Sequence, residues 1–551
     1  MADFPWFKSY PEFVPKEISV DNYANIGAIY DEAVSKFGDR IAYKNMDTTL
    51  TFNELDEQVN ALIWYLQNRT NLKPGDRIAL QMPNLLQMPV AIFACLKAGY
   101  ILVNTNPLYT ADEMLHQYKD SEAKVIIILE NFAANLEKIL DQTSIETVIL
   151  TRVGDMCPPV KGSIVNLVVK HVKKMVPSFS LPSAKRWKDC LKEGLGKNPQ
   201  NVDIQLSDVA FLQYTGGTTG VSKGAELTHG NICANVQQVE AWIGSLFEEG
   251  QETIITALPL YHIFALTANC VVFFRYGATN VLITNPRDMK SFMKDLKKNP
   301  FSILTGVNTL FNGMMNQEAF RALDFTPLKL ALGGGMAVQD VVADRWQKIT
   351  GSPLLEAYGL SETSPAATIN PVDGTHQRGT IGLPLPNTEL GIFDDNYNRL
   401  GFNEPGEIGV KGPQVMKGYW KRQDETDRCM KNGFFMTGDI GIMKEDGFFK
   451  IVDRKKEMIN VSGFNVFPNE IEKIIAEHPK VLEVGVRGET DDSGKEYPKA
   501  FIIKKDSSLT AEEIQAFCHE KLTNYKVPRE VVFRDELPKS NVGKILRRKL
   551  V

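Results

Sequence analysis

The sequence predicts a multidomain α/β protein. We expect a large N-terminal domain of layered αβ subdomains with a small β-barrel-like subdomain, followed by a small α+β C-terminal domain. Three observations predict this fold class. The chain has 551 residues, too many for a single hydrophobic core. Short β-rich runs alternate with amphipathic segments from about residue 50 onward, and after about residue 385 short strands joined by Asn, Asp and Gly turns replace them.

The N-terminal alternation is typical of a parallel sheet covered by helices. Helix-like segments cover residues 52–67 and 111–120. Strand-like runs begin at Arg77, Ala123, Thr147 and Phe301.

The C-terminal part divides into two pieces. Runs that begin at Glu389, Glu407 and Phe448 predict short antiparallel strands. The end of the chain then predicts helix, strand, strand and helix over residues 469–477, 481–487, 500–504 and 511–521. The charged run 453–457 separates the pieces, so we predict domains at 1–453 and 458–551 with a linker at 454–457.

Composition excludes several classes of protein. A net charge of −5 provides no basic surface for nucleic acid. The seven cysteines are scattered and form no Cys-x-x-Cys pair, so we expect neither a disulfide framework nor a zinc site, and a reducing cytoplasm suits them. The N-terminus lacks the layout of a signal peptide. The longest largely apolar stretch, 263–274, is too short to span a bilayer.

A loop rich in glycine and threonine is the strongest functional signal. Residues 214–224 contain four glycines, three threonines and Lys223, between a strand-like run at Val209 and a helix start at Thr228. Inward-turned backbone N–H groups, hydroxyls and a mobile cation suit phosphate oxygens. The alternative is a flexible turn without a ligand. A P-loop requires Gly-Lys-Ser/Thr, and here Ser222 precedes the lysine, which disfavours a kinase or P-loop ATPase.

Three more clusters contain chemically useful residues. Residues 356–363 follow a strand-like run and offer Tyr358, which could stack on a base, and Glu362, which could hold a hard cation. Asp439, in Met-Thr-Gly-Asp, could accept both ribose hydroxyls, although Gly-Asp pairs are also common in turns. Near the C-terminus a Gly-containing turn carries Lys544 ahead of a basic segment, which alone would be a solvated C-terminal helix.

The order of these motifs resembles the signature of the adenylate-forming superfamily, which includes acyl-CoA synthetases, peptide-synthetase adenylation domains and luciferases. The resemblance covers essentially the whole chain. Further blocks at residues 258–265, 285–288, 306–311, 411–416 and 461–472 are similar to bacterial long-chain fatty-acid–CoA ligases.

The resemblance implies a two-step reaction with ATP, Mg2+ and CoA, for fatty-acid uptake and β-oxidation. A long-chain fatty acid attacks the α-phosphate of ATP, and CoA then displaces AMP. By resemblance, Thr215 and Glu362 hold Mg2+, Lys223 with Thr218 and Thr219 cradles phosphates, and Lys544 bridges the carboxylate and α-phosphate. The implied ATP and AMP contacts are Thr215, Gly216, Gly217, Thr218, Thr219, Gly220, Lys223, Gly334, Gly335, Glu356, Tyr358, Gly359, Ser361, Asp439 and Arg454.

The family rotates its C-terminal domain between the two steps. The resemblance therefore implies a mobile C-terminal domain, with Lys456 at the hinge. It assigns Ser462, Gly463 and Phe464 to the CoA channel. It also matches His262 to an aromatic gate beside the acyl pocket, where the alternative is a packed core histidine.

A basic amphipathic segment suggests a membrane surface. Ile164, Leu167, Val168, Val172 and Met175 fall at helical spacing opposite Lys170, Lys173 and Lys174. We hypothesise peripheral contact with the cytoplasmic face of the inner membrane. A surface helix packed on its own domain is the alternative.

Other functions fit some of the motifs. A fatty acyl-AMP ligase or an adenylation enzyme would load a carrier-protein thiol, although no carrier domain follows Val551. A luciferase-like oxygenase shares the first step. A silent acyl-nucleotide sensor would not need Lys223, Glu362, Asp439 and Lys544 together. Relatives include homodimers, so a homodimer is also considered.

Overall fold

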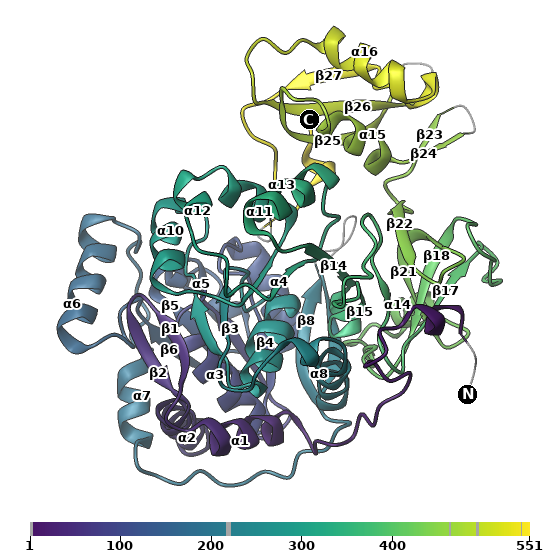
Figure 1. Cartoon of the computed structure of the whole chain (residues 1–551). Helices are drawn as coiled ribbons and strands as arrows, with labels where there is room; N and C mark the ends of the chain where they lie inside the picture. Colours follow the sequence, from purple (N-terminus) through teal and green to yellow (C-terminus); the bar gives the residue numbers. More distant parts are fainter. Residues whose placement is uncertain (1–3, 216–221, 462–463, 492–494, 541–542) are drawn as a thin grey trace.

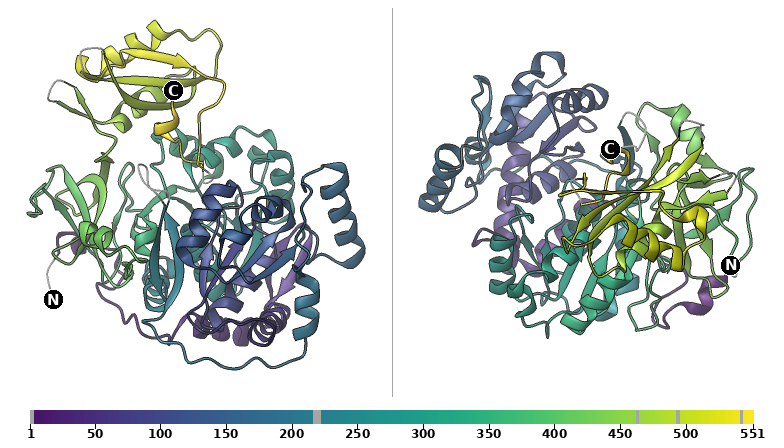
Figure 2. Two further views of the ribbon diagram at one scale, coloured as in Figure 1. Left: turned by 180° about the vertical axis from the view of Figure 1, so that it is seen from behind. Right: turned by 90° about the horizontal axis from the view of Figure 1, so that it is seen from above.

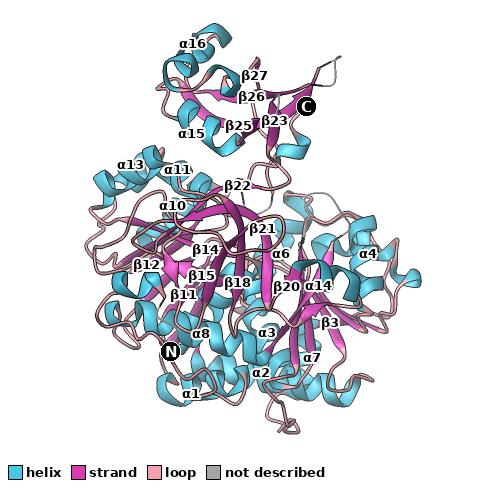
Figure 3. Ribbon diagram, turned by 90° about the vertical axis from the view of Figure 1, so that its right-hand side faces the viewer, coloured by secondary structure: helices cyan, strands magenta, loops and turns pink. Residues whose placement is uncertain are grey.

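A large domain carries a smaller C-terminal domain above one end (Figure 1). The computed structural model describes residues 4–215, 222–461, 464–491, 495–540 and 543–551. The views from behind and above show the same two-part arrangement (Figure 2). Helices gather around the sheets of the large domain, and β22 leads up to the small domain (Figure 3).

Two large sheets, rather than one, form the centre of the large domain. The first has the order β19-β9-β8-β4-β3-β5-β6-β7 and the second β16-β15-β14-β13-β12-β10-β11-β1-β2. The first comprises β3 (Arg77–Gln81), β4 (Ile101–Asn104), β5 (Val125–Leu129), β6 (Thr147–Thr151), β7 (Lys185–Arg186), β8 (Val209–Thr215), β9 (Lys223–Thr228) and β19 (Gly418–Tyr419). The second comprises β1 (Ile41–Asn45), β2 (Thr48–Thr51), β10 (Thr253–Thr256), β11 (Thr279–Leu282), β12 (Ile303–Gly306), β13 (Leu330–Gly333), β14 (Leu354–Gly359), β15 (Ala366–Ile369) and β16 (Leu383–Pro384).

The central strands of both sheets are parallel, as the alternation predicted. The predicted helices at 52–67 and 111–120 form as α2 and α4, and each begins with a threonine capping box. Helix α3 is apolar around its whole circumference and buried, which is the pattern of a helix inside the core. The helices of this domain are α1 (Ile26–Phe37), α2 (Phe52–Arg69), α3 (Gln87–Lys97), α4 (Ala111–Ser121), α5 (Ala133–Glu137), α6 (Pro159–Leu167), α7 (Trp187–Gly194), α8 (His229–Ile243), α9 (Phe273–Arg275), α10 (Met289–Lys298), α11 (Asn308–Met315), α12 (Glu318–Arg321), α13 (Asp340–Thr350) and α14 (Gln423–Cys429).

A smaller antiparallel sheet lies beside the two large ones, as predicted for the region after residue 385. Its main path is β17-β18-β21-β20, and β22 pairs with β21. Its strands are β17 (Glu389–Phe393), β18 (Gly406–Lys411), β20 (Met430–Lys431), β21 (Phe434–Met443) and β22 (Phe449–Arg454).

The small domain has its own hydrophobic core between a three-stranded sheet and two helices. It contains β23 (Ile459–Val461), β24 (Phe464–Val466), α15 (Pro468–Ala476), β25 (Val481–Thr490), β26 (Glu496–Lys504), α16 (Ala511–Lys521) and β27 (Glu530–Phe533).

The structure adds one strand that was not predicted and corrects one alternative for the C-terminus. Residues after the glycine loop form strand β9, which pairs with β8, before the helix begins. The alternative of a solvated basic C-terminal helix is wrong: the segment is a 3-10 turn, Arg547–Lys549, in which Arg547 pairs with the carboxylates of Asp453 and Glu472. No helix in the described parts of the chain is long and apolar enough to cross a membrane.

Candidate active site

The carboxyl ends of neighbouring parallel strands bring several predicted residues to one edge. Strands β12, β13 and β14 pair in parallel, so the segments that follow them meet there. These segments contain Thr309, Gly334, Gly335 and Glu362. In open α/β sheets this edge is where ligands bind.

Strands β8 and β9 frame the glycine loop. Thr215 ends β8 and is paired with Lys223, the first residue of β9. Gly216, Gly217, Thr218, Thr219 and Gly220 lie outside the described residues, so their predicted phosphate contacts stay predictions.

The amino group of Lys223 has defined neighbours. It donates to Glu425 Oε2 at 2.7 Å and lies 4.4 Å from the ring centroid of Tyr419. Phosphate oxygens could replace the Glu425 carboxylate as the acceptor for this ammonium group, while its contact with the aromatic ring is kept.

Glu362 lies in the 3-10 turn after β14 and is buried. Tyr419 donates its hydroxyl to Glu362 Oε1 at 2.7 Å. Burial raises the pKa of Glu362, and the more distant charges of Arg454 and Lys223 only partly offset this effect. This carboxylate therefore sits where a bound cation would stabilise it.

Tyr358, Asp439 and Arg454 form one hydrogen-bonded chain. The Tyr358 hydroxyl donates to Asp439 Oδ2 at 2.7 Å, and Arg454 Nε lies 3.0 Å from Asp439 Oδ1. Asp439 on β21 and Arg454 on β22 are paired residues of adjacent strands. The structure thus brings together three residues predicted to contact adenosine, from two different sheets.

The predicted glycines allow close packing. A Cβ on Gly359 would lie 1.8 Å from the carbonyl oxygen of Pro365, so no side chain fits there. Gly335 has φ +75°, which favours glycine. A Cβ on Gly334 would lie 3.0 Å from the ring of Phe264, and Ser361 opens the turn that contains Glu362.

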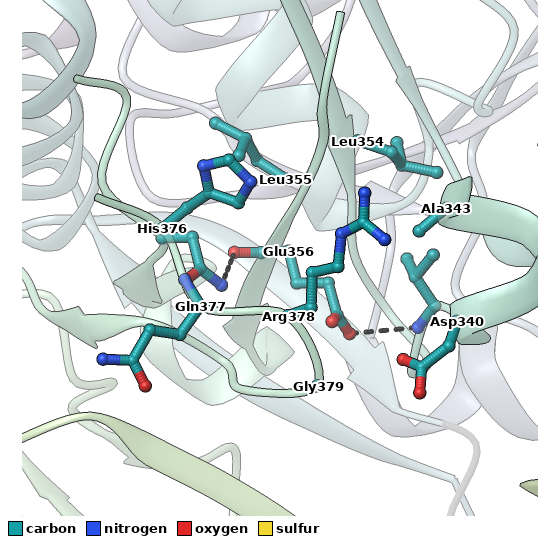
Figure 4. Close-up of a pocket in the computed structure, with 11 residues that line it drawn as sticks. Asp340, Ala343, Leu354, Leu355, Glu356, His376, Gln377, Arg378 and Gly379 are labelled. Atoms are coloured by element: carbon teal, nitrogen blue, oxygen red, sulfur yellow. Dashed lines mark hydrogen bonds between the residues drawn. The ribbon is translucent and has the colours of Figure 1, made fainter. Parts of the chain in front are cut away.

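The carboxylate of Glu356 is held by the protein itself (Figure 4). Its carboxylate accepts from the backbone N–H of Val338 at 3.0 Å, in a small polar pocket that also contains His376 and Arg378. Burial raises the pKa of Glu356 to about 7. Its side chain therefore links the segment after β13 to β14, and its predicted nucleotide contact stays a prediction.

Lys544 reaches the same edge from the small domain. Thr309 Oγ1 donates to the carbonyl of Gly543 at 3.2 Å, which docks the lysine's loop on the large domain. Burial, followed by the positive charge of Arg454, lowers the pKa of Lys544 to about 8, while the charge of Asp439 acts in the opposite direction. Lys544 therefore lies within electrostatic range of the adenosine residues.

Of the predicted hinge and channel residues, the structure describes Lys456 and Phe464. Lys456 is exposed in the segment after β22. Phe464 is 55% exposed and stacks on Tyr525 with 4.6 Å between ring centroids. Ser462 and Gly463 lie outside the described residues.

His262 is partly buried beside Phe264. Its Nδ1 accepts from the backbone N–H of Phe264 at 3.3 Å. Burial lowers the pKa of His262 to about 4, so the ring is neutral at pH 7. Since Phe264 also faces Gly334, this segment borders the predicted adenylate edge.

Sequence reasoning missed Tyr419, Glu425 and Thr309. Tyr419 and Glu425 contact the predicted residues Glu362 and Lys223, which are far away in sequence, and Thr309 contacts Gly543, next to Lys544. Thr309 lies within the 306–311 block, and Tyr419 follows the 411–416 block closely, but neither block indicates these contacts.

Comparison with known proteins identifies the family. The model for AMP-binding enzymes matches residues 30–420, and the model for the AMP-binding enzyme C-terminal domain matches residues 470–544. The chain belongs to the AMP-binding enzyme family. Long-chain-fatty-acid–CoA ligases are similar to it: that of Escherichia coli O6:H1 is 53% identical over 99% of this chain and 97% of its own length. That of Haemophilus influenzae is 49% identical over the same shares.

Solved structures of AMP-binding enzymes share the fold. An anthranilate CoA ligase, AuaEII, in complex with anthranoyl-AMP superposes with a TM-score of 0.85 at 22% identity, covering 97% of this chain and 98% of its own. ATP-bound MatB from Rhodopseudomonas palustris gives 0.81 at 25% identity, covering 96% and 98%. The predicted fold class is thereby confirmed.

Proposed function

We propose that this chain is a long-chain-fatty-acid–CoA ligase, which converts a fatty acid, ATP and CoA to acyl-CoA, AMP and pyrophosphate. One observation carries the proposal: ligases with that activity in their names are about half identical to the chain along nearly its whole length. Both domains are included in that match, so the likeness extends beyond the adenylate-binding part.

In the first step a carboxylate oxygen of the acid bonds to the α-phosphorus of ATP, and pyrophosphate leaves. Negative charge builds on the phosphoryl oxygens, and cations that face them lower the barrier. Lys544 and Lys223 supply this charge at the two ends of the triphosphate. Asp439 accepts from the ribose hydroxyls while Arg454 and Tyr358 hold its carboxylate in place.

In the second step the CoA sulfur bonds to the acyl carbon, and AMP leaves with the electrons of the broken C–O bond. Lys544 occupies the approach to that carbon, so the small domain has to turn away. The exposed segment around Lys456 is the proposed hinge. Phe464, with Ser462 and Gly463, then lines the CoA channel.

Magnesium fits the donor set around Glu362. A buried carboxylate whose pKa is raised by burial gains from a cation. Among the described residues no cluster of three or more metal-ligating side chains occurs, and Mg2+ typically takes one or two carboxylates and completes its shell with phosphate oxygens and water. Glu362 and Thr215 would hold it, and it would neutralise phosphate charge.

Pyrophosphate release over acids from acetate to oleate tests the proposal. We expect release to be greatest with long-chain acids and to yield acyl-CoA when CoA is present. Acyl carrier protein, tested in place of CoA, distinguishes a carrier-loading enzyme. Release with none of these acids would contradict the proposal.

Lys544→Ala tests the assignment of the two steps. The variant should lose acyl-adenylate formation by about 100-fold or more, the range for removing one charge-stabilising group. It should keep thioester formation from preformed acyl-adenylate. Equal loss of both steps would contradict a role of Lys544 in acyl-adenylate formation alone.

We further propose that α6 and the turn after it contact an anionic membrane surface. This segment stands away from the body of the large domain (Figure 1). Four of its predicted apolar side chains are exposed, Ile164 58%, Leu167 57%, Val172 67% and Met175 54%, while Val168 is partly buried. Exposed lysines accompany them, a combination that favours the interface of a bilayer.

Co-sedimentation with vesicles that contain anionic lipid tests this contact. Replacing Lys170, Lys173 and Lys174 with glutamate should abolish binding. The matched control makes the same charge change on exposed lysines of α10, Lys290, Lys294 and Lys297. Equal binding by both variants would reject the contact.

A further inference from the structure

A buried cluster around Arg547 joins the two domains outside the catalytic edge. Arg547 Nη1 lies 3.1 Å from Asp453 Oδ1, and its Nε donates to Glu472 Oε1 at 2.8 Å. Arg547 also pairs with Glu457 and Asn469. One guanidinium thus binds groups on either side of the predicted linker.

The partners of Arg547 come from both domains. Asp453 belongs to β22, in the antiparallel sheet of the large domain. Glu472 and Asn469 belong to α15 of the small domain. Asp453 contacts α15 a second time, since its Oδ2 accepts from the backbone N–H of Asn469 at 2.7 Å.

Because Asp453 is buried, loss of its contact with Arg547 would be energetically costly. Asp453 is completely buried, and the side chain of Arg547 is 11% exposed. A buried carboxylate without a partner is costly, whereas a paired and hydrogen-bonded one is tolerated. Burial raises the pKa of Asp453, and the charge of Arg547 opposes that shift. The small domain therefore supplies the cation that Asp453 requires.

A second ionic contact between the described parts of the two domains is weaker. Lys473 on α15 lies 2.6 Å from Asp340 on α13, but both side chains are roughly half exposed. Exposed ion pairs contribute little because solvent screens them. Of these two contacts, the Asp453–Arg547 pair therefore depends more strongly in energy on how the domains are arranged.

The cluster also lies at the base of the loop that carries Lys544. Lys539 and Ile545 form a β-bridge, and the N–H of Leu546 donates to Pro538 at 2.8 Å. These contacts close the loop directly before Arg547. A fixed Arg547 therefore fixes the direction in which Lys544 points.

We propose that Asp453 and Arg547 form an interdomain latch that holds the small domain where Lys544 meets the adenosine residues. A turn about the 454–457 linker breaks the pair and leaves Arg547 with Glu472 in the small domain. Arg547 is thus a positioning residue for the first step, and opening the latch precedes the second. The inference rests on the proposed two-step function.

The test measures both steps separately in Asp453→Asn and Arg547→Gln. We expect acyl-adenylate formation to fall about tenfold or more, within the usual range of coupling between sites. Thioester formation from preformed acyl-adenylate should stay within about twofold of the unmodified enzyme or increase, since opening then costs less. Lys549→Gln is the matched control, because it removes an exposed cation from the same 3-10 turn.

A second readout follows the domain arrangement without catalysis. Acetylation of Lys544 by acetic anhydride, measured by mass spectrometry, should be faster in both latch variants than in the control. Urea unfolding shows whether each variant is folded. Equal loss of both steps, or no loss of the first, would overturn the latch.

Lys544→Ala, assayed in parallel, separates the two proposals. If that variant loses only the first step and the latch variants lose neither, the latch is wrong and the function stands. If it retains the first step, the assigned role of Lys544 is wrong. The proposed function itself fails only if the unmodified enzyme releases pyrophosphate with none of the acids.

Discussion

The lowered pKa of Lys544 leads to a quantitative prediction for pH dependence. Burial and Arg454 lower this pKa from its ordinary value of 10.5 to about 8. If the pKa is 8, the protonated fraction falls from about 90% at pH 7 to about 10% at pH 9. An exposed lysine would stay almost fully protonated over the same range. Because the first step requires the cation, its kcat/KM for ATP should fall about ninefold between pH 7 and pH 9.

The same shift affects stability in a defined direction. A base whose pKa is lower in the folded state binds fewer protons there than in the unfolded state. The resulting penalty is greatest below pH 8 and is relieved as pH rises from about 8 to 10.5. The shift corresponds to about 3 kcal/mol at most. The bound triphosphate and carboxylate offset this penalty, since they return counter-charge to the ammonium group.

Pyrophosphate release without CoA, at subsaturating ATP and saturating acid, measures the profile from pH 6.5 to 10. Lys544→Arg is the control, since its guanidinium stays charged over this range. We expect the kcat/KM for ATP of this variant to show no fall between pH 7 and pH 9. A flat profile in the unmodified enzyme, or the same limb in Lys544→Arg, would refute the reasoning.

Three further substitutions follow from the geometry. Tyr358→Phe removes the hydroxyl that donates to the Asp439 carboxylate, the group proposed to bind the ribose. It should raise KM for ATP about tenfold, since hydrogen bonds to charged groups contribute about 1.5–3 kcal/mol. An unchanged KM would contradict this expectation. Gly543→Ala puts a Cβ 2.6 Å from Thr309 Oγ1 at φ +82°, a strain of about 1–2 kcal/mol before the clash, so the first step should slow while the second does not. Gly359→Ala puts a Cβ 1.8 Å from the oxygen of Pro365 and should lower the free energy of unfolding by about 3 kcal/mol or more, and an unchanged urea midpoint would disprove that packing.

Most elements could be predicted because their signals are local. Threonine capping boxes began α2 and α4 near the expected residues, and the helices and strands of the small domain followed from periodicity. The number of sheets could not be predicted, since periodicity indicates where a strand lies but not which strands it pairs with. Strand β9 was missed for the same reason: it is defined by pairing with β8 across the glycine loop.

The candidate site shows the same division. Lys223, Glu362, Asp439 and Lys544 were found because each lies in a compact motif. Glu356 also lies in such a motif, yet its carboxylate holds the backbone of Val338, which no spacing reveals. A motif predicts the type of residue at a site, while the direction of the side chain depends on its neighbours.

By itself the sequence determined the family, the order of most elements and the candidate residues for nucleotide binding. Each of these depends on neighbours along the chain. The tertiary structure alone decided the partners across long separations. It joined Tyr358 to Asp439, docked Gly543 on Thr309 and buried Asp453 against Arg547. The physical reason is that burial and pairing set the energy of a charge, and both are properties of contacts that exist only once the chain has folded.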